Sequence, residues 1–522
     1  METPKPLPFA WLFRWKVWRV LLLIAASLVT LVALFDAEEN WRGKRAWENY
    51  KEQKEARGVN FDYAKCVPPR VPDDQNFAMT PFLAPLFDYL PGAQQARDSN
   101  AVQRIYNAVQ VPNAVQSQLN KAGWPEGISL DLVRVANTLV APHRSAPPRF
   151  QPGQTQEAAK AILEKLKPAA AVFDELQNAS RRPSSRFNIA YDWNPKFGIL
   201  LPHLGVIKGL CYMLAVRGCA ELALGQTGAV HQDVQLMFHL TDSLRNEPFL
   251  VSQLVRADCL TVALQPVWDG LAGHQWSDQQ LEDIAQNLRK LDLLADDARA
   301  LEAERCFGDS LFIELRAARN PISYVGDIAD SQGTADFLSF LSRGFAGLLF
   351  PRGWYYLEEL TYDKMYDGQI NGVMTTNGID PELADRRTGE LIGKLGSGGF
   401  FSTLLHHRIL SRMMLPALNN FERKMARAQD RASLALIACA LERCRLANGQ
   451  FPDTLNALVP RFLPMVPHDV IMGQPLIYRP TPAGQFTLYS VGWNNKDDNG
   501  TYPRNDKSDT TNGDWVWKYP QQ

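Results

Sequence analysis

Residues 20–35 form an apolar run near the start of the chain, and no other feature constrains the fold as strongly. The run contains no charged residue, and its only polar residues are Ser27 and Thr30. Two apolar residues precede Arg19, so the interrupted stretch reaches about 18 residues, a length that spans a membrane. Arginine can extend its charge to the interface, where tryptophan side chains also prefer to lie. The pattern predicts a transmembrane helix over residues 17–35.

Charged residues on the two sides of this run predict its orientation. Basic residues precede it and acidic residues follow it: Lys5, Arg14, Lys16 and Arg19 before, and Asp36, Glu38 and Glu39 after. Because positive flanks stay in the cytoplasm, we expect a cytoplasmic N-terminus and a periplasmic or extracellular bulk. A cleaved signal peptide is the alternative, but Leu34 and Phe35 are larger than cleavage sites prefer. We therefore expect a single-pass, uncleaved signal anchor in the inner (cytoplasmic) membrane.

Composition excludes some classes of function. The chain has 55 basic and 56 acidic residues, so its net charge of -1 creates no general attraction for nucleic acid, and no nucleic-acid partner is expected. Seven cysteines occur without a CxxC pair, so the sequence supports neither a disulfide framework nor a zinc site. Most of these cysteines lie in apolar helical patterns, where a small buried side chain is the ordinary role.

The remaining patterns divide the chain into parts and predict a mainly α fold. The expected parts are a cytoplasmic tail and transmembrane anchor (1–36), a juxtamembrane helix with an irregular segment (37–150), an α-helical body (151–320), an aromatic-rich helical extension (321–414) and a small α+β module (415–522). In the body, helical periodicity recurs between Gly and Pro turns. Ser277 with Gln280 has the pattern of a capping box. The apolar stretch 334–350 is too short to span a membrane, so we expect a buried helix, with re-entry into the membrane surface as the alternative.

The C-terminal hundred residues have a more specific pattern. An amphipathic helix ends at "CRLANGQFP", where Gly449 stops the helix and Pro452 follows. "TLNALVPRFL" reads as a short second helix. "PLIYRP" and "QFTLYSV" read as two strands, and "TPAG" joins them as a hairpin.

The order of "CRLANGQFP", "LPMVPHDVIMGQPLIYR" and "LYSVGWNN" resembles the periplasmic part of the major pseudopilin of type II secretion. The resemblance covers about a fifth of the chain. The combination of anchor and C-terminal segment is also similar to large membrane-anchored bacterial proteins of the Verrucomicrobia and Planctomycetes group that end in this segment. The anchor lacks the prepilin peptidase site and the membrane glutamate of pseudopilins. Filament assembly is therefore not expected, and the module is interpreted as a cap or docking unit.

The resemblance implies a calcium site in the polar loop after "LYS". The implied ligands are the carbonyl groups of Leu488 and Ser490 and the side chains of Asn494, Asp497, Asp498 and Asp514, with Asp506 and Asp509 as further candidates. Calcium takes about six to eight hard oxygen ligands, which such a loop can supply. Asparagine at the first side-chain position lowers the ligand charge. The alternative is that Asp, Asn and Gly accumulate here for turn formation alone, because no regular ligand spacing is present.

Catalytic signals are weak. No HExxH, GxSxG, Walker or GxGxxG motif occurs in a suitable context. The histidines lack ligand spacing, whether the adjacent His406 and His407 or the separated His231 and His239. Acid pairs are available, namely Glu358 with Glu359 and Glu302 with Asp309, although solvated surface acids are the ordinary interpretation.

The sequence therefore favours a non-enzymatic, membrane-tethered envelope protein that acts as an interaction scaffold. Residues 17–35 would contact the membrane, an envelope protein would be the partner, and calcium would stabilise the C-terminal module. The alternative is a membrane-anchored periplasmic hydrolase with a site in the helical body. Neither catalytic residues nor an organic cofactor are assigned.

Overall fold

The computed structural model describes residues 15–121, 123–140, 148–194, 196–318, 351–370, 374–375, 378–396, 421–481, 485–502 and 511–519. Several residues named above lie outside these ranges, namely Lys5, Arg14, the apolar stretch 334–350, His406, His407, Asp506 and Asp509. The described part is mainly helical, as the sequence predicted, and it contains a small antiparallel sheet near its C-terminal end.

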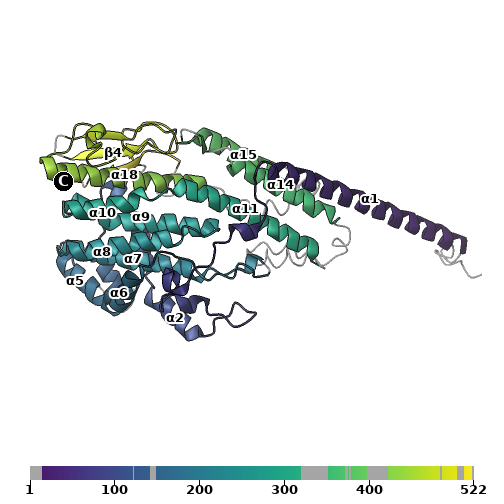
Figure 1. Ribbon diagram of the computed structural model, residues 1–522, viewed down its shortest axis with the longest axis horizontal. Coiled ribbons are helices and arrows are strands. Elements are labelled where there is room, and N and C mark those ends of the chain that lie inside the picture. Colours follow the sequence, from purple (N-terminus) through teal and green to yellow (C-terminus); the bar gives the residue numbers. More distant parts are fainter. Residues whose placement is uncertain are drawn as a thin grey trace, which may run out of the picture.

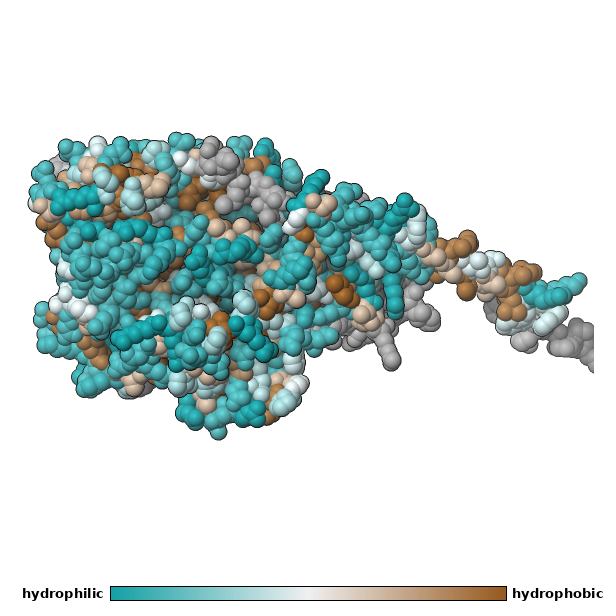
Figure 2. Space-filling view, viewed as in Figure 1, coloured by the Kyte–Doolittle hydropathy of each residue, from teal (hydrophilic) through white to brown (hydrophobic). Residues whose placement is uncertain are grey.

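Helix α1 (Trp15–Glu55) begins in the apolar run and continues without a break through the charged segment after it. Its side chains are exposed between residues 18 and 38, and its buried positions are Glu39, Gly43 and Trp47. This spacing of four residues places the buried positions on one face of the helix. Figure 1 shows α1 projecting from the body, and in Figure 2 apolar (brown) surface gathers along the projecting part. Within the described residues, α1 is the one helix long and apolar enough to span a membrane.

The other helices enclose the core of the molecule. They are α2 (Ser99–Ala108), α3 (Asn113–Asn120), α4 (Leu132–Val140), α5 (Thr155–Leu166), α6 (Ala170–Ala179), α7 (Pro202–Ala223), α8 (Thr227–Ser243), α9 (Leu250–Ala272), α10 (Asp278–Arg289), α11 (Leu293–Ala317), α14 (Gly353–Ile370), α15 (Pro381–Gly396) and α18 (Phe421–Asn448). Helices α7 and α9 are apolar on nearly every side and pack against each other at the centre, because a helix of this kind must be buried.

The start of α10 confirms the predicted capping box. The backbone N–H of Gln280 donates to the Ser277 hydroxyl (3.3 Å), and the Gln280 side chain accepts from the backbone N–H of Ser277 (3.0 Å). The apolar face that follows, Leu281, Ile284, Ala285 and Leu288, is buried.

The C-terminal sheet has the order β3-β4-β5, and all of its pairings are antiparallel. The predicted hairpin is confirmed as β3 (Ile477–Pro480) and β4 (Phe486–Ser490), whereas β5 (Trp515–Lys518) is a third strand that the sequence did not predict. A separate short pair, β1 (Met374–Thr375) and β2 (Gly378–Ile379), lies before α15.

The sheet packs directly on the helical body. Trp268 of α9 donates a hydrogen bond from Nε1 to the carbonyl of Lys518 (2.9 Å), and the rings of Trp124 and Trp517 lie 5.0 Å apart. A single hydrophobic cluster consequently runs from the segment after α1 to the last described residues.

The predicted short helix in "TLNALVPRFL" is a single 3-10 turn, Leu455–Leu458. Val459 leaves the turn with an extended backbone because Pro460 follows it, and a residue before proline is disfavoured in the α conformation. The helix before this turn ends at Asn448, and Gly449 adopts a φ of +81°, as its position after the helix predicted.

Candidate functional site

The most distinctive site in the described residues is the contact of α1 with α14 and α11. We call it the anchor joint and define it by Glu39, Asn40, Gly43, Lys54, Arg305, Asp309, Arg316, Gly353, Trp354, Glu359, Asp363 and Asp367. The joint connects the helix that bears the apolar run to the folded body, so it decides how this helix projects from the body.

Two glycines allow α1 and α14 to approach closely. A Cβ atom on Gly43 would lie 2.8 Å from the carbonyl carbon of Gly353 and closer still to its oxygen, and a Cβ on Gly353 would meet the backbone of Glu39 and Asn40. The backbone N–H of Gly353 also donates to the Asn40 side chain (2.5 Å). Backbone-to-backbone contact at this crossing therefore excludes any larger residue.

Side chains above and below the crossing hold α1 and α14 in register. Trp354 donates from Nε1 to Glu39 (2.8 Å), and its ring meets the edge of Phe35 at 6.4 Å. At the other end, Lys54 forms an ion pair with Asp367. The helices run parallel, because residue 39 of α1 contacts residue 354 of α14 and residue 54 contacts residue 367, so the numbering increases in the same direction along both helices.

Buried charges connect α14 to α11. Arg305 donates from Nη1 to Asp363 (3.0 Å) and to Asp309 (3.3 Å), and Arg316 pairs with Glu359. The side chains of Arg305, Asp309, Asp363 and Glu359 are at most 4% exposed. Such pairs require charge balance, because an uncompensated charge at this depth is strongly destabilising.

Burial and the balance of charges in this cluster favour retention of a proton on its carboxyl groups. Three carboxyl groups face two guanidinium groups, and Asp309 and Asp363 each keep one buried oxygen without a donor in the described part of the chain. Burial raises the pKa of Asp363 to about 6 and that of Glu359 to about 7. Burial and the neighbouring Asp363 also raise the pKa of Asp309 well above its ordinary value. A protonated carboxyl at this position completes the balance.

The structure brings together only part of the acid pairs that the sequence suggested. Asp309 and Glu359 lie in the cluster, whereas Glu302 is exposed on α11; Glu358 is buried beside Glu359. The sequence alone did not point to Asp363, Arg305 or Arg316. Its spacing of four residues from Glu359, which places both acids on one face of α14, was the available signal.

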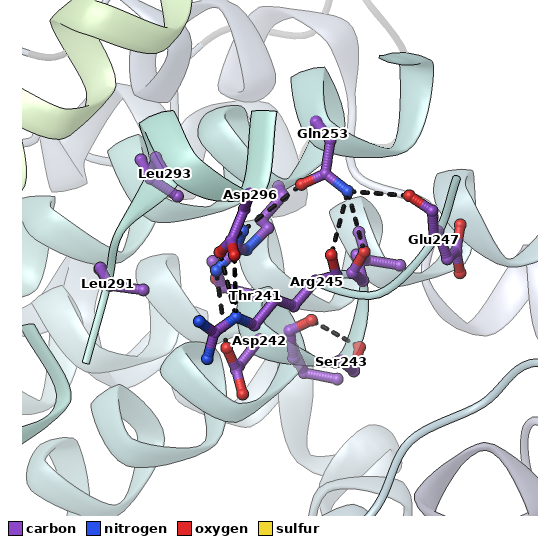
Figure 3. A network of polar contacts seen from close by, with 12 residues as sticks. Thr241, Asp242, Ser243, Arg245, Glu247, Gln253, Leu291, Leu293 and Asp296 are labelled. Carbon is purple, nitrogen blue, oxygen red and sulfur yellow. Dashed lines mark hydrogen bonds and ion pairs between the residues drawn. The ribbon is translucent and has the colours of Figure 1, made fainter. Parts of the chain in front are cut away.

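A second buried network stabilises the helical body (Figure 3). Asp296 accepts hydrogen bonds from Arg256 (2.7 Å) and Arg245 (3.1 Å) and also pairs with Arg299. Burial acts to raise the pKa of Asp296, but Arg256 and Arg245 hold this pKa below its ordinary value. The amide of Gln253 donates to the carbonyl groups of residues 244, 245 and 247, after the end of α8. This network therefore caps α8 and links it to α9 and α11.

An open surface pocket of about 750 Å³ lies between the segment after α1 and residues 186–192 at the edge of the helical body, where the sequence placed the alternative hydrolase site. Its lining includes Arg70, Asp88, Arg186 and Asp192. Asp88 and Asp192 are both exposed, and Asp88 is paired with Arg97 at 3.0 Å. The pocket therefore presents solvent-exposed polar side chains.

His231 and His239, the two separated histidines considered above, each contact a neighbouring side chain. His231 lies 3.4 Å from Asp283, and the ring of His239 packs against Phe77 with centroids 4.5 Å apart. In the part of the chain that the structure describes, no group of three or more His, Cys, Asp or Glu side chains is arranged to hold a metal ion.

The backbone positions proposed for calcium lie in the sheet. Leu488 is in the central strand and pairs with Tyr478 on one side and Trp517 on the other, and Ser490 pairs with Trp515. In a central strand the neighbouring strands use the backbone carbonyl groups, which leaves Leu488 poorly available to a cation.

The side chains proposed for calcium lie close together in the turn after β4, but the chain itself supplies hydrogen-bond donors to them. Asp514 accepts from the backbone N–H groups of Asp498 (3.2 Å) and Gly500 (2.6 Å). Asn494 donates to the Asp498 carboxylate (2.9 Å), and Asp497 accepts from Tyr489 and Arg479 (both 2.9 Å). Burial, together with the charges of Asp498 and Asp497, raises the pKa of Asp514, so these acids act on one another.

By its fold, the described part of the chain is a mainly helical protein with one candidate membrane-spanning helix and a three-stranded antiparallel sheet. No family model, no curated protein and no solved structure matches it. The resemblance of the C-terminal module to a pseudopilin remains a prediction from the sequence.

Proposed function

We propose that this chain is a non-enzymatic, membrane-tethered envelope protein that serves as an interaction scaffold. One observation carries the proposal: α1 is a continuous helix whose apolar part is exposed and whose later part is fixed to the body at the anchor joint. Exposed apolar residues over this length are stabilised by lipid. The basic residues before the run and the acidic residues after it support a cytoplasmic N-terminus, with the body on the periplasmic or extracellular side.

A groove on the C-terminal module supports the scaffold role. It has a volume of about 670 Å³, and its lining includes Val459, Met465, Pro467 and Leu476. The side chains of Met465 and Val459 are 64% and 38% exposed, so the groove presents apolar surface to solvent. Figure 1 places this module at the end of the molecule remote from the projecting part of α1, where an envelope partner could reach it.

Site-specific photo-crosslinking tests this function. We expect a photoreactive amino acid at Met465, in the full-length protein in intact spheroplasts, to form a discrete adduct that stays in the membrane pellet after an alkaline carbonate wash. Ile313, which is also exposed on α11, is the matched control position and is expected to form no such adduct. Release of the protein by carbonate, or protection of the body from protease added outside spheroplasts, would contradict the membrane anchor or its orientation.

Calcium is proposed to stabilise the turn that contains Asp497, Asp498 and Asp514. Burial, followed by the charges of Asp498 and Asp497, raises the pKa of Asp514, and this supports the proposal, since a divalent cation beside Asp514 would favour its ionised form. With Asn494 lowering the ligand charge, binding is expected to be weak. We expect 5 mM calcium, about five times a Kd near 1 mM, to raise the melting temperature of the full-length protein in detergent by about 1 °C.

Magnesium at the same concentration and the Asp514→Asn variant are the controls for calcium. Magnesium is expected to have little effect, because it demands a tighter octahedral site. Equal melting temperatures in calcium and in a chelator would show that the loop accumulates acidic residues for turn formation alone.

A further inference from the structure

Two cysteines that are far apart in the sequence have adjacent sulfur atoms. Cys66 ends the 3-10 turn Tyr63–Cys66, which follows α1, whereas Cys306 lies in α11. The two thiols interact, since their contact lowers the pKa of Cys66 and raises the pKa of Cys306. The amide of Asn60 contacts both sulfurs, with its Nδ2 atom 3.3 Å from Cys66 Sγ and 3.9 Å from Cys306 Sγ. All seven cysteines are free thiols in this structure.

The surroundings of the two thiols give them different roles in exchange chemistry. Cys66 is half-buried, and the hydrogen bond with Cys306 lowers the pKa of its thiol. Cys306 is buried, donates to the carbonyl of Asn60 (3.1 Å) and lies 3.7 Å from Nη2 of Arg305. An accessible sulfur with thiolate character reacts first. The contact with Cys66 and burial raise the pKa of the Cys306 thiol, so Cys306 reacts second, after Cys66 has formed the mixed disulfide.

We propose that Cys66 and Cys306 are a redox pair that forms a disulfide by exchange with a disulfide oxidant. The Cys66 thiolate attacks one sulfur of the oxidant, whose S–S bond breaks and whose other sulfur leaves as a thiol. The Cys306 thiol then gives its proton to solvent, and its thiolate attacks Cys66 Sγ and displaces the second half of the oxidant. Two protons and two electrons pass from the pair to the oxidant, which becomes two thiols.

The bond would lock the anchor joint. Cys306 is the neighbour of Arg305, and Arg305 also donates from Nη2 to the carbonyl of Asn60. A Cys66–Cys306 bond therefore joins the segment that leaves α1 to the turn of α11 that supports α14. Because it closes a loop of more than two hundred residues, it would strongly restrict the unfolded chain. The proposal stands independently of the scaffold function, since it depends only on the two thiols and their access to an oxidant.

A second thiol pair provides an internal control. The thiols of Cys211 of α7 and Cys259 of α9 also interact, but both are completely buried. The interaction with Cys211 raises the pKa of the Cys259 thiol, and burial raises it further. No oxidant can reach either of these sulfurs in the folded protein. If proximity alone were sufficient, both pairs would form a disulfide; if access is also required, only Cys66 and Cys306 would form one.

Oxidation of the purified full-length protein with oxidised glutathione tests the pair. We expect loss of two hydrogens from the intact mass, a single cross-linked peptide that contains Cys66 and Cys306, and a rise of at least about 5 °C in melting temperature. Reduction is expected to reverse all three. The Cys66→Ser variant is expected to lose the cross-link, and the Cys211→Ser variant is expected to keep it.

Several outcomes would overturn the pairing. They are a stable glutathione adduct on Cys66 without a cross-link, a cross-link between Cys211 and Cys259 at the same rate, or a Cys66–Cys306 bond that leaves the melting temperature unchanged. Since Cys66→Ala removes the same sulfur with a smaller side chain, it distinguishes loss of the thiol from a folding defect of the serine variant.

Discussion

Replacement of Arg305 by methionine is expected to destabilise the folded protein by about 3–5 kcal/mol at pH 8. Methionine fills similar space but removes the guanidinium that both Asp309 and Asp363 contact. The side chain of Arg305 is only 4% exposed, so water cannot take over its role. The loss also frees the carbonyl of Asn60 from one of its donors, which loosens the segment after α1.

The pH dependence of this loss has a definite sign. The folded pKa values of the cluster carboxyls are raised above their unfolded values, so their contribution to stability is fully present below the unfolded pKa and is lost as the pH rises through about 6 for Asp363 and about 7 for Glu359. Removing Arg305 raises the folded pKa values of Asp309 and Asp363 further. The variant is therefore expected to recover most of its stability near pH 5 and to be weakest at pH 8.

Urea unfolding at pH 5 and pH 8, followed by tryptophan fluorescence, measures this difference. Arg97→Met is the matched control, because Arg97 pairs with Asp88 at a site where both side chains are more than half exposed. It is expected to change the free energy of unfolding by less than about 1 kcal/mol at either pH. An Arg305→Met variant with equal losses at both pH values would show that the carboxyls carry no shared proton.

Gly353→Val is expected to separate α1 from α14 and to cost about 3 kcal/mol. The added side chain would occupy the space of the Glu39 and Asn40 backbone, which cannot move away as a flexible side chain can. The helices would then lose the hydrogen bonds of Asn40 with residue 353 and of Trp354 with Glu39. Hydrogen exchange is expected to accelerate in residues 39–55 of α1 and to stay unchanged in α7 and α9.

Gly205→Val is the matched control for this substitution. Gly205 also lies in a helix, but a Cβ atom there meets nothing within 4 Å, so valine is expected to leave exchange and stability nearly unchanged. If α1 keeps its protection in the Gly353→Val protein, the close crossing does not hold the anchor helix to the body.

Local features of the fold were predictable because their causes lie within a few residues. The exposed apolar length of α1, the capping box of Ser277 with Gln280, the stop at Gly449 and the β3–β4 hairpin each depend on hydrogen bonds or periodicity within one element. Strand β5 was missed because "WVWK" is only four residues long and gains its stability from pairing with β4 and from packing on Trp124 and Trp268.

The candidate site was only partly predictable for a related reason. Asp309 and Glu359 were named as acids, but a sequence with 56 acidic residues does not show which of them lose their solvent. Arg305 and Asp363 are 58 positions apart, and Cys66 and Cys306 are 240 apart. Nothing in the spacing of such residues indicates that they meet.

The sequence alone determined that residues 20–35 need an apolar environment and that helices dominate, because transfer from water and helical periodicity are properties of contiguous residues. The tertiary structure alone decided where α1 crosses α14, which carboxyls are buried together and which two thiols contact Asn60. Those properties arise from burial and proximity between distant segments, and burial changes the energy of a charge or a thiol far more than its neighbours in the chain do.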